Sequence, residues 1–480
     1  MFVSLFFLIF LAVLWLLYIV IPSKWRKVVL CIFSYVFCGY LSISALVAMA
    51  ISTVVTFAGA LIIEKNKDNK KRSGVIAVAT ILLFAIVLVV VKNIPYAIKL
   101  MGITALGEDS FLTSIVLPVG FSFYAFQAIG YIYDVYMGKE RAEKDFVSFA
   151  LYMGFFAKIV SGPIERKGRF SEQLDKLSDV VVYDWNRISL GLTYMAWGYF
   201  LKLVVADRLA LIVNVIHGDS ALFDGIWLIL GAVMYSFQVY TDFAGYTFIA
   251  IGCANLFGIE LIQNFASPYW SKSITEFWRR WHMSLSSWLR DYVYIPLGGN
   301  RKGKLRKQTN TLIVFILCGI WHGNGVSFVV WGLLHGIYSI IDNTLGRKFT
   351  AERGFGALVR RLVTFVAVTT AWIFFRADTL AGGCRYIIGI VANGINPRGG
   401  IGVLEAQGVV LIQALLAVAF IILVQIIDGI CYKKAVSLPE MVQQNRVLKY
   451  ALLYCCLMAI FVFGIYGGDF KAENFIYMQF

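Results

Sequence analysis

Long uncharged segments recur along this chain and constrain its fold more than any other feature. One of them extends from Thr311 to Ile341 without an Asp, Glu, Lys or Arg residue, whereas a membrane-spanning helix needs about 20 residues. Only 15% of all residues are charged, against about 25% in soluble domains. The sequence therefore predicts an all-α, polytopic membrane protein with about 11 transmembrane helices plus re-entrant or interfacial helices. The other uncharged runs are Phe2–Pro22, Val28–Ile63, Ser73–Val91, Phe111–Ile132, Phe146–Phe156, Ile188–Phe200, Gly225–Thr241, Phe243–Gly258, Leu362–Phe375, Gly408–Ile427 and Tyr450–Gly468.

Basic residues are concentrated in short loops. The 43 Lys and Arg residues outnumber the 28 Asp and Glu residues, which gives a formal net charge of +15. The clearest clusters are Lys65–Arg72, Arg301–Lys307 and Arg347–Arg361. Because cytoplasmic loops of membrane proteins are enriched in Lys and Arg, we expect these loops in the cytoplasm. Membrane topology accounts for the basic charge, so no nucleic-acid partner is expected.

No linker, low-complexity tract or fixed-period repeat divides the chain. We therefore expect residues 1–480 to form a single transmembrane domain. The eight cysteines lie mostly within apolar runs and include no CxxC pair. This placement is typical of small buried hydrophobic side chains.

The segment Asn264–Asn300 is too polar to span a membrane and too aromatic to be a solvated loop. Ser273 and Glu276 have the spacing of a capping box, which predicts the start of a helix, and Pro296 predicts its end. An interfacial or re-entrant helix and a simple aromatic anchor both fit this pattern. The helical spacing places Arg279, Met283, Ser286 and Arg290 on one face and Trp281, Leu285, Trp288 and Tyr292 on another.

The run from Thr311 to Ile341 contains the sequence CGIWHGNGV, with His322 near its centre. If both flanking basic clusters are cytoplasmic, the run is too short for two full crossings, so a break at the glycines is expected. If one flank lies outside, the run is a single long tilted helix. In both cases the histidine lies near mid-membrane, where a polar group is costly and indicates function.

The chain has four histidines, and their spacing does not fit a metal site. No HxxxH or HExxH pattern and no Cys–His cluster is present, so no metal is expected. For His335 a structural hydrogen bond is the favoured interpretation, and for His217 no functional role is expected. His282 lies on the predicted amphipathic helix, which leaves His322 as the main catalytic candidate.

A neutral imidazole in an apolar surround can act as a general base. It takes the proton of a hydroxyl group while that oxygen attacks an acyl carbon. A thioester donor such as acyl-CoA carries phosphates, which Arg279, Arg280 and Arg290 are placed to bind from the cytoplasm; membrane topology alone also explains these arginines. Asp242 either ties helices together or orients a catalytic group.

Several segments resemble the bacterial membrane-bound O-acyltransferases, and within them the alginate O-acetylase branch. The most specific segment is Tyr240–Lys304, which contains FWRRWHMSLSSWLRDYVYIPLGGN, followed by WHGNGVSFVVWGLLHG. Supporting pieces are LPVGFSFYAFQAIGYIYDVY, SGPIER, WIFFRA and the closing FIYMQF. The resemblance implies a multipass helical fold that encloses a central funnel or tunnel.

The resemblance also implies site residues. The histidine of its WHG motif, the catalytic residue of the family, corresponds to His322, and the histidine of its RRWH motif corresponds to His282. Trp321, Asn324 and Asp242 are assigned to substrate or donor binding together with the three arginines named above.

Members of this family move an acyl group from a cytoplasmic donor to a cell-surface polymer. For this chain the resemblance implies acetyl-CoA as donor, no bound cofactor, an extracytoplasmic SGNH-like acetyltransferase as partner, a polysaccharide acceptor and a place in the bacterial cytoplasmic membrane. The alternatives are D-alanyl transfer to teichoic acid from an acylated carrier protein, a glycan or lipid transporter, and a scaffold that only recruits a surface enzyme.

Overall fold

The computed structural model describes residues 2–100, 118, 120–160, 162–344, 354–394 and 397–465. The described residues are predominantly helical and contain no strand, which confirms the predicted all-α class. Ser161 of SGPIER and the closing FIYMQF lie outside the described residues. The chain divides into two compact units, Met1–Met195 with Ala250–Ile262, and Ala196–Ile249 with Gln263–Phe480.

Unit 1 is built from residues 1–195 and 250–262. In it α3 packs against both α4 and α5, and α2 packs against α3 and α6. The predicted run Val28–Ile63 holds two helices, because Ser42 ends α2 and caps α3 by accepting a hydrogen bond from the Ala45 N–H. The helices of unit 1 are α1 (Leu5–Val20), η1 (Ser23–Trp25), α2 (Arg26–Leu41), α3 (Ile43–Lys65), α4 (Lys70–Leu100), α5 (Phe121–Tyr136), α6 (Phe146–Gly154), α7 (Phe156–Ile159), α8 (Lys167–Asp175), η2 (Leu177–Asp179) and most of α9 (Trp185–Tyr199).

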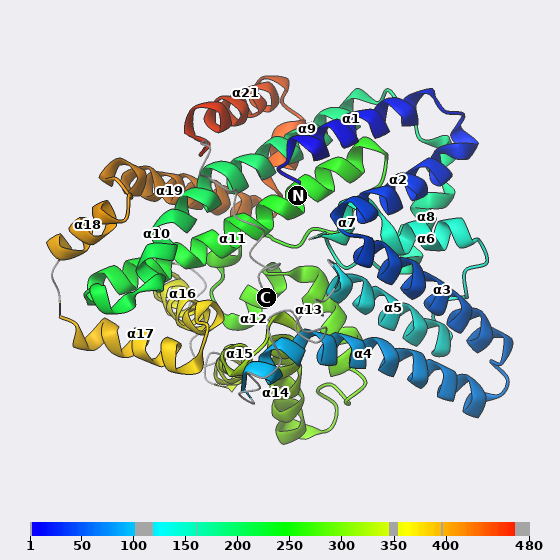
Figure 1. Ribbon diagram of the computed structural model, residues 1–480, viewed down its shortest axis with the longest axis horizontal. Coiled ribbons are helices and arrows are strands. Elements are labelled where there is room, and N and C mark those ends of the chain that lie inside the picture. The colour runs from blue at the N-terminus through cyan, green and yellow to red at the C-terminus, as the bar shows by residue number, and fades with distance from the viewer. Residues whose placement is uncertain are drawn as a thin grey trace. The chain divides into compact units, whose positions relative to one another are not determined.

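Unit 2 contains the remaining helices, drawn from green to red in Figure 1. Its first elements are η3 (Phe200–Ala206), α10 (Asp207–Gly218), η4 (Ser220–Leu222) and most of α11 (Gly225–Leu256). They are followed by η5 (Pro268–Trp270), α12 (Ile274–Arg280), α13 (Met283–Leu289), η6 (Arg290–Tyr294), α14 (Gly303–His322), α15 (Val326–Thr344), α16 (Gly354–Arg376), α17 (Leu380–Ala392), α18 (Pro397–Ala406), α19 (Leu411–Lys434), α20 (Leu438–Gln443) and α21 (Arg446–Phe463). Helices η3 and η6 are π-helices.

Seven helices in the described part of the chain are long and apolar enough to cross a membrane. They are α3, Lys70–Asn93 of α4, α11, α15, α16, α19 and α21. Shorter apolar helices are α1, α17 and the segment Phe146–Ile159. The protein is therefore a multi-pass membrane protein, while the predicted number of about 11 spans and the central funnel stay predictions.

Two expected boundaries are wrong. The runs Gly225–Thr241 and Phe243–Gly258 form the single helix α11, because Asp242 is buried in an ion pair and does not end the helix. The helix expected from Ser273 to Pro296 is broken at Trp281 and His282 into α12, α13 and η6. Its expected start is confirmed, since the Ser273 side chain accepts a hydrogen bond from the Glu276 N–H.

Helices α14 and α15 form an antiparallel hairpin whose turn is the WHGNG sequence (Figure 1). The break expected at the glycines is confirmed, and the alternative of one long helix is wrong: α14 ends at His322, and Gly325 has a φ of 118° that only glycine adopts readily. Gly319 allows close packing, because a Cβ there would collide with the backbone oxygen of Phe328. His322 is thus fixed at the tip of a closely packed helix pair.

Candidate active site

His322 is the last residue of α14 and lies against an aromatic wall. Its ring centroid is 4.7 Å from that of Trp321, 5.0 Å from that of Trp331 and 5.5 Å from that of Phe375. The residue is only 3% exposed. The side chains in these ring contacts are uncharged, as the proposed role of a neutral base requires.

His282 occupies the break between α12 and α13. Its φ of 44° is in the left-handed region, which is uncommon for residues other than glycine. Asn264 holds this conformation: its backbone oxygen accepts from the Met283 N–H at 3.1 Å, and its side-chain oxygen accepts from the Ser284 N–H at 3.1 Å. Strained backbone of this kind is often found at functional sites.

The His282 ring is fully buried, and it packs edge-on against Phe243 of α11 with 4.7 Å between ring centroids. Burial lowers the pKa of His282 below its usual value, so the ring is neutral at pH 7.

The structure brings the two motif histidines together. Their ring centroids are 6.3 Å apart, and the Trp321 ring contacts both of them. Two helix breaks far apart in the sequence therefore form one buried imidazole pair within unit 2. Trp321, assigned to binding from the sequence, lies in this site.

Asn324 lies in the turn directly after His322 and Gly323. Its side-chain oxygen is buried and accepts no hydrogen bond from the described part of the chain. An unsatisfied buried acceptor is costly, so this oxygen is suited to receive a donor from a bound substrate.

The three arginines expected at the donor site have different environments. The Arg280 guanidinium is held by the Glu276 carboxylate at 3.0 Å and by the Ala266 backbone oxygen at 3.0 Å. Arg279 and Arg290 are exposed, and Arg290 pairs with Asp291 at 2.8 Å. Arg279 and Arg290 are therefore accessible to a ligand in solution, whereas Arg280 is part of the framework.

Asp242 belongs to a buried cluster of charges. The Lys202 ammonium group lies 2.7 Å from a carboxylate oxygen of Asp207 and 2.7 Å from one of Asp242. Lys202 is in the π-helix η3, so Asp242 ties α11 to this element and the structural interpretation is supported. Since Phe243 contacts His282, the cluster also sets the position of a ring in the site.

The other two histidines have different partners, although His335 contacts the Trp331 ring that also contacts His322. The His335 Nδ1 accepts a hydrogen bond from the Trp278 Nε1–H at 3.2 Å, which is the structural bond expected from the sequence. The His217 ring is stacked on Tyr386 with centroids 4.5 Å apart. Among the described residues no group of three His, Cys, Asp or Glu side chains is arranged to hold a metal ion.

Lys202 and Asn264 were not predicted as site residues. Lys202 pairs with Asp242, next to Phe243, and Asn264 accepts the hydrogen bonds that hold the backbone at His282. Lys202 had a detectable signal, because it is a lone charge within an apolar segment, and such charges are usually paired. Asn264 had none, since its role depends on the conformation of His282.

The site residues lie within a stretch that matches a family model. Residues 140–375 match the model of the MBOAT, membrane-bound O-acyltransferase family. This range contains both histidines, the turn after His322 and the Lys202 cluster.

Curated relatives extend the match over most of the chain. A "Probable alginate O-acetylase AlgI" of Pseudomonas fluorescens is 35% identical over 384 residues, which are 78% of this chain and 72% of that protein. A "Peptidoglycan O-acetyltransferase" of Helicobacter pylori is 35% identical over 59% of this chain and 58% of that protein. A "Teichoic acid D-alanyltransferase" of Streptococcus thermophilus is 33% identical over 48% of this chain and 58% of that protein. With two buried motif histidines in a multi-pass helical fold and relatives of this extent, the chain belongs to the membrane-bound O-acyltransferase family.

Proposed function

We propose that this protein takes an acetyl group from acetyl-CoA in the cytoplasm and passes it across the bacterial cytoplasmic membrane for O-acetylation of a cell-surface or secreted polysaccharide. The observation that carries this proposal is the buried pair of His282 and His322 in a chain of this acyltransferase family. The relatives named for alginate and for peptidoglycan O-acetylation support the acetyl group and the polymer class.

In the proposed reaction His322 is the general base. Its ring takes the proton of an acceptor hydroxyl while that oxygen attacks the thioester carbonyl, and the C–S bond breaks. The CoA thiolate leaves and receives the proton from the imidazolium. The products are the acetyl ester and the free CoA thiol, and the ring returns to its neutral form.

The other site residues bind and position the substrates. The exposed side chains of Arg279 and Arg290 bind donor phosphates, and Asn324 accepts a hydrogen bond from the bound acyl donor or acceptor. His282 positions the thioester next to His322. An extracytoplasmic SGNH-like acetyltransferase then transfers the acetyl group from this ester to a polysaccharide hydroxyl, which regenerates the hydroxyl of the first acceptor.

The test is thioester consumption by purified protein in proteoliposomes. Wild type incubated with acetyl-CoA and an acceptor releases free CoA thiol, and His322→Gln reduces this rate by about 100-fold or more, the range for loss of a general base. The matched control is His335→Gln, a buried histidine on α15 whose hydrogen bond to Trp278 a glutamine oxygen can replace. Undiminished turnover in His322→Gln removes this residue from the chemistry.

D-alanyl transfer is the second candidate, because the Streptococcus thermophilus relative carries that name. It is supported over a smaller part of the chain than O-acetylation. Replacing acetyl-CoA with a D-alanyl carrier-protein thioester in the same assay separates the two functions. A transporter or a scaffold consumes neither thioester.

A further inference from the structure

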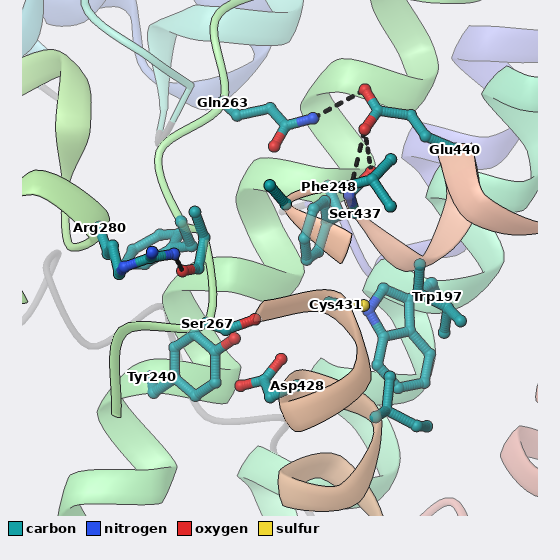
Figure 2. A pocket seen from close by; sticks show the side chains of 16 residues that line it. Trp197, Tyr240, Phe248, Gln263, Ser267, Arg280, Asp428, Cys431, Ser437 and Glu440 are labelled. Atoms are coloured by element: carbon teal, nitrogen blue, oxygen red, sulfur yellow. Dashed lines mark hydrogen bonds between the residues drawn. The ribbon is translucent and has the colours of Figure 1, made fainter. Parts of the chain in front are cut away.

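A cavity lies in unit 2, and neither His282 nor His322 lines it. Figure 2 shows this cavity of about 260 Å³ between α11, α12, the end of α19 and the turn into α20. The rings of Trp197, Tyr240, Phe248 and Phe265 are part of its wall. Its volume is below the roughly 300–1,000 Å³ of pockets that hold drug-sized ligands. It therefore fits a small polar group and excludes a coenzyme as large as CoA.

Asp428 of α19 carries a buried carboxylate that points into this cavity (Figure 2). The residue is 7% exposed, and the hydroxyl groups of Tyr240 and Ser267 face it. Its Oδ2 atom accepts no hydrogen bond from the described part of the chain. No described Lys or Arg forms an ion pair with it.

The other charged groups of the cavity do not supply the missing partner. The Arg280 guanidinium is bonded to Glu276 and to the Ala266 oxygen. Glu440 adds a second carboxylate, which accepts from the Gln263 side-chain amide at 2.9 Å. A buried carboxylate is costly unless it gains a positively charged partner or takes up a proton, and carboxylates beside aromatic rings suit an organic ammonium group.

The position of the cavity at the end of α19 indicates the source of the ammonium group. Helix α19 is a candidate membrane span, and Asp428 and Cys431 lie in its last turns. The exposed residues Lys433 and Lys434 follow at the helix end, next to the lining residue Ala435. Basic residues at the end of a span lie at the depth of lipid headgroups and attract their phosphates.

We propose that this cavity binds the headgroup of an aminophospholipid, with its ammonium group against Asp428 and its phosphate against Lys433 and Lys434. The inference is independent of the proposed acyl transfer, since it rests on the cavity alone. Arg280, which lines the cavity, lies two residues before His282 in the chain.

The experiment measures which lipid the full-length protein retains. Purified, delipidated protein is placed in vesicles of phosphatidylglycerol that contain equal amounts of phosphatidylethanolamine and N-acetylated phosphatidylethanolamine, which lacks the ammonium group. Native mass spectrometry then counts the lipids bound after gentle extraction. We expect the wild type to retain phosphatidylethanolamine at least tenfold over its acetylated form, and Asp428→Asn to retain both about equally.

Two further variants make the result specific. Asp378→Asn removes an exposed carboxylate just beyond the end of another span, α16, and retains the wild-type preference. Val436→Trp fills the cavity from the α19–α20 turn while Asp428 stays in place, and it loses lipid retention even if Asp428→Asn fails to fold.

Equal retention of the two lipids by wild type overturns the proposal, as does an unchanged preference in Asp428→Asn. Free ethanolamine is the second probe. Displacement of bound lipid by ethanolamine supports the ammonium site, whereas ethanolamine binding without any lipid retention overturns the lipid as its source.

Discussion

His282 precedes α13 and His322 ends α14, yet their ring centroids are 6.3 Å apart and both rings contact Trp321. Neither break is a flexible loop. One is held by two hydrogen bonds to Asn264, and the other by the close packing of α14 on α15. The two rings are therefore positioned before any substrate binds, which reduces the reorganisation that catalysis requires.

Two substitutions of His282 distinguish the role of its ring from that of its backbone conformation. Both His282→Ala and His282→Gly remove the imidazole, but only glycine adopts a φ of 44° without steric cost. We expect His282→Gly to be more stable than His282→Ala by about 1 kcal/mol, measured by thermal unfolding in detergent. Both variants should lose acetyl-CoA turnover. Normal turnover in either variant limits His282 to a structural role.

The exposed arginines should control donor affinity. The double variant Arg279→Ala/Arg290→Ala is expected to raise the KM for acetyl-CoA about tenfold with little change in kcat, because each guanidinium makes a charge-assisted bond to phosphate. Steady-state kinetics at two salt concentrations measure this effect. Arg72→Ala, at an exposed position in the first turn of α4 in unit 1, is the control for general surface charge. An unchanged KM refutes donor binding by these two residues.

The ion pairs of Lys202 with Asp207 and Asp242 should contribute to the free energy of unfolding. Lys202→Met leaves the carboxylates of Asp207 and Asp242 buried without their cation, which costs about 3–5 kcal/mol. Adding Asp242→Asn to this variant removes one uncompensated charge and should recover part of the loss. A denaturation series over these variants measures the coupling. A Lys202→Met protein as stable as wild type contradicts the buried ion pairs.

The α14–α15 hairpin should not tolerate a methyl group at Gly319. A Cβ there collides with the backbone oxygen of Phe328 and forces the helices apart, so Gly319→Ala is expected to cost about 1–3 kcal/mol and to displace His322. Gly402→Ala is the matched control, because a Cβ at Gly402 of α18 meets no atom within 4 Å. Melting temperature and turnover are measured together, and both should fall only in Gly319→Ala.

The fold should lose stability in acid as the Glu276 carboxylate becomes protonated. Burial alone raises the pKa of this carboxyl group, but bonds from the Lys272 N–H, the Tyr432 hydroxyl and Arg280 outweigh burial and hold the pKa below its usual value of 4.5. A carboxylate with a lowered folded-state pKa stabilises the fold above its unfolded pKa, and this contribution is lost as the pH falls through the folded value.

The melting temperature of wild type should consequently fall more steeply below pH 4.5 than that of Glu276→Gln. Glu260→Gln, at an exposed glutamate, should follow wild type. Identical acid profiles for wild type and Glu276→Gln would show that these bonds add no stability.

The sequence predicted the elements that depend on local pattern. The capping residue Ser273 and the break after His322 are both present, because a cap and a glycine act over a few residues. The continuous helix faces expected from Arg279 to Tyr292 are interrupted at Trp281 and His282.

What the sequence did not predict depends on partners distant in the chain. Asp242 was expected to separate two runs, and only Lys202 explains why it stays inside α11. The left-handed His282 depends on Asn264, 18 positions earlier in the printed sequence. The roles of Arg279, Arg280 and Arg290 also differ because of tertiary neighbours, so spacing alone assigned all three to the donor.

The length of α14 sets a geometric requirement on the donor. Its 20 residues rise by about 30 Å between the basic residues at its start and His322 at its end. If the proposed donor is held through its phosphates near the start of α14, its thioester reaches the imidazole only at the tip of a long, slender arm.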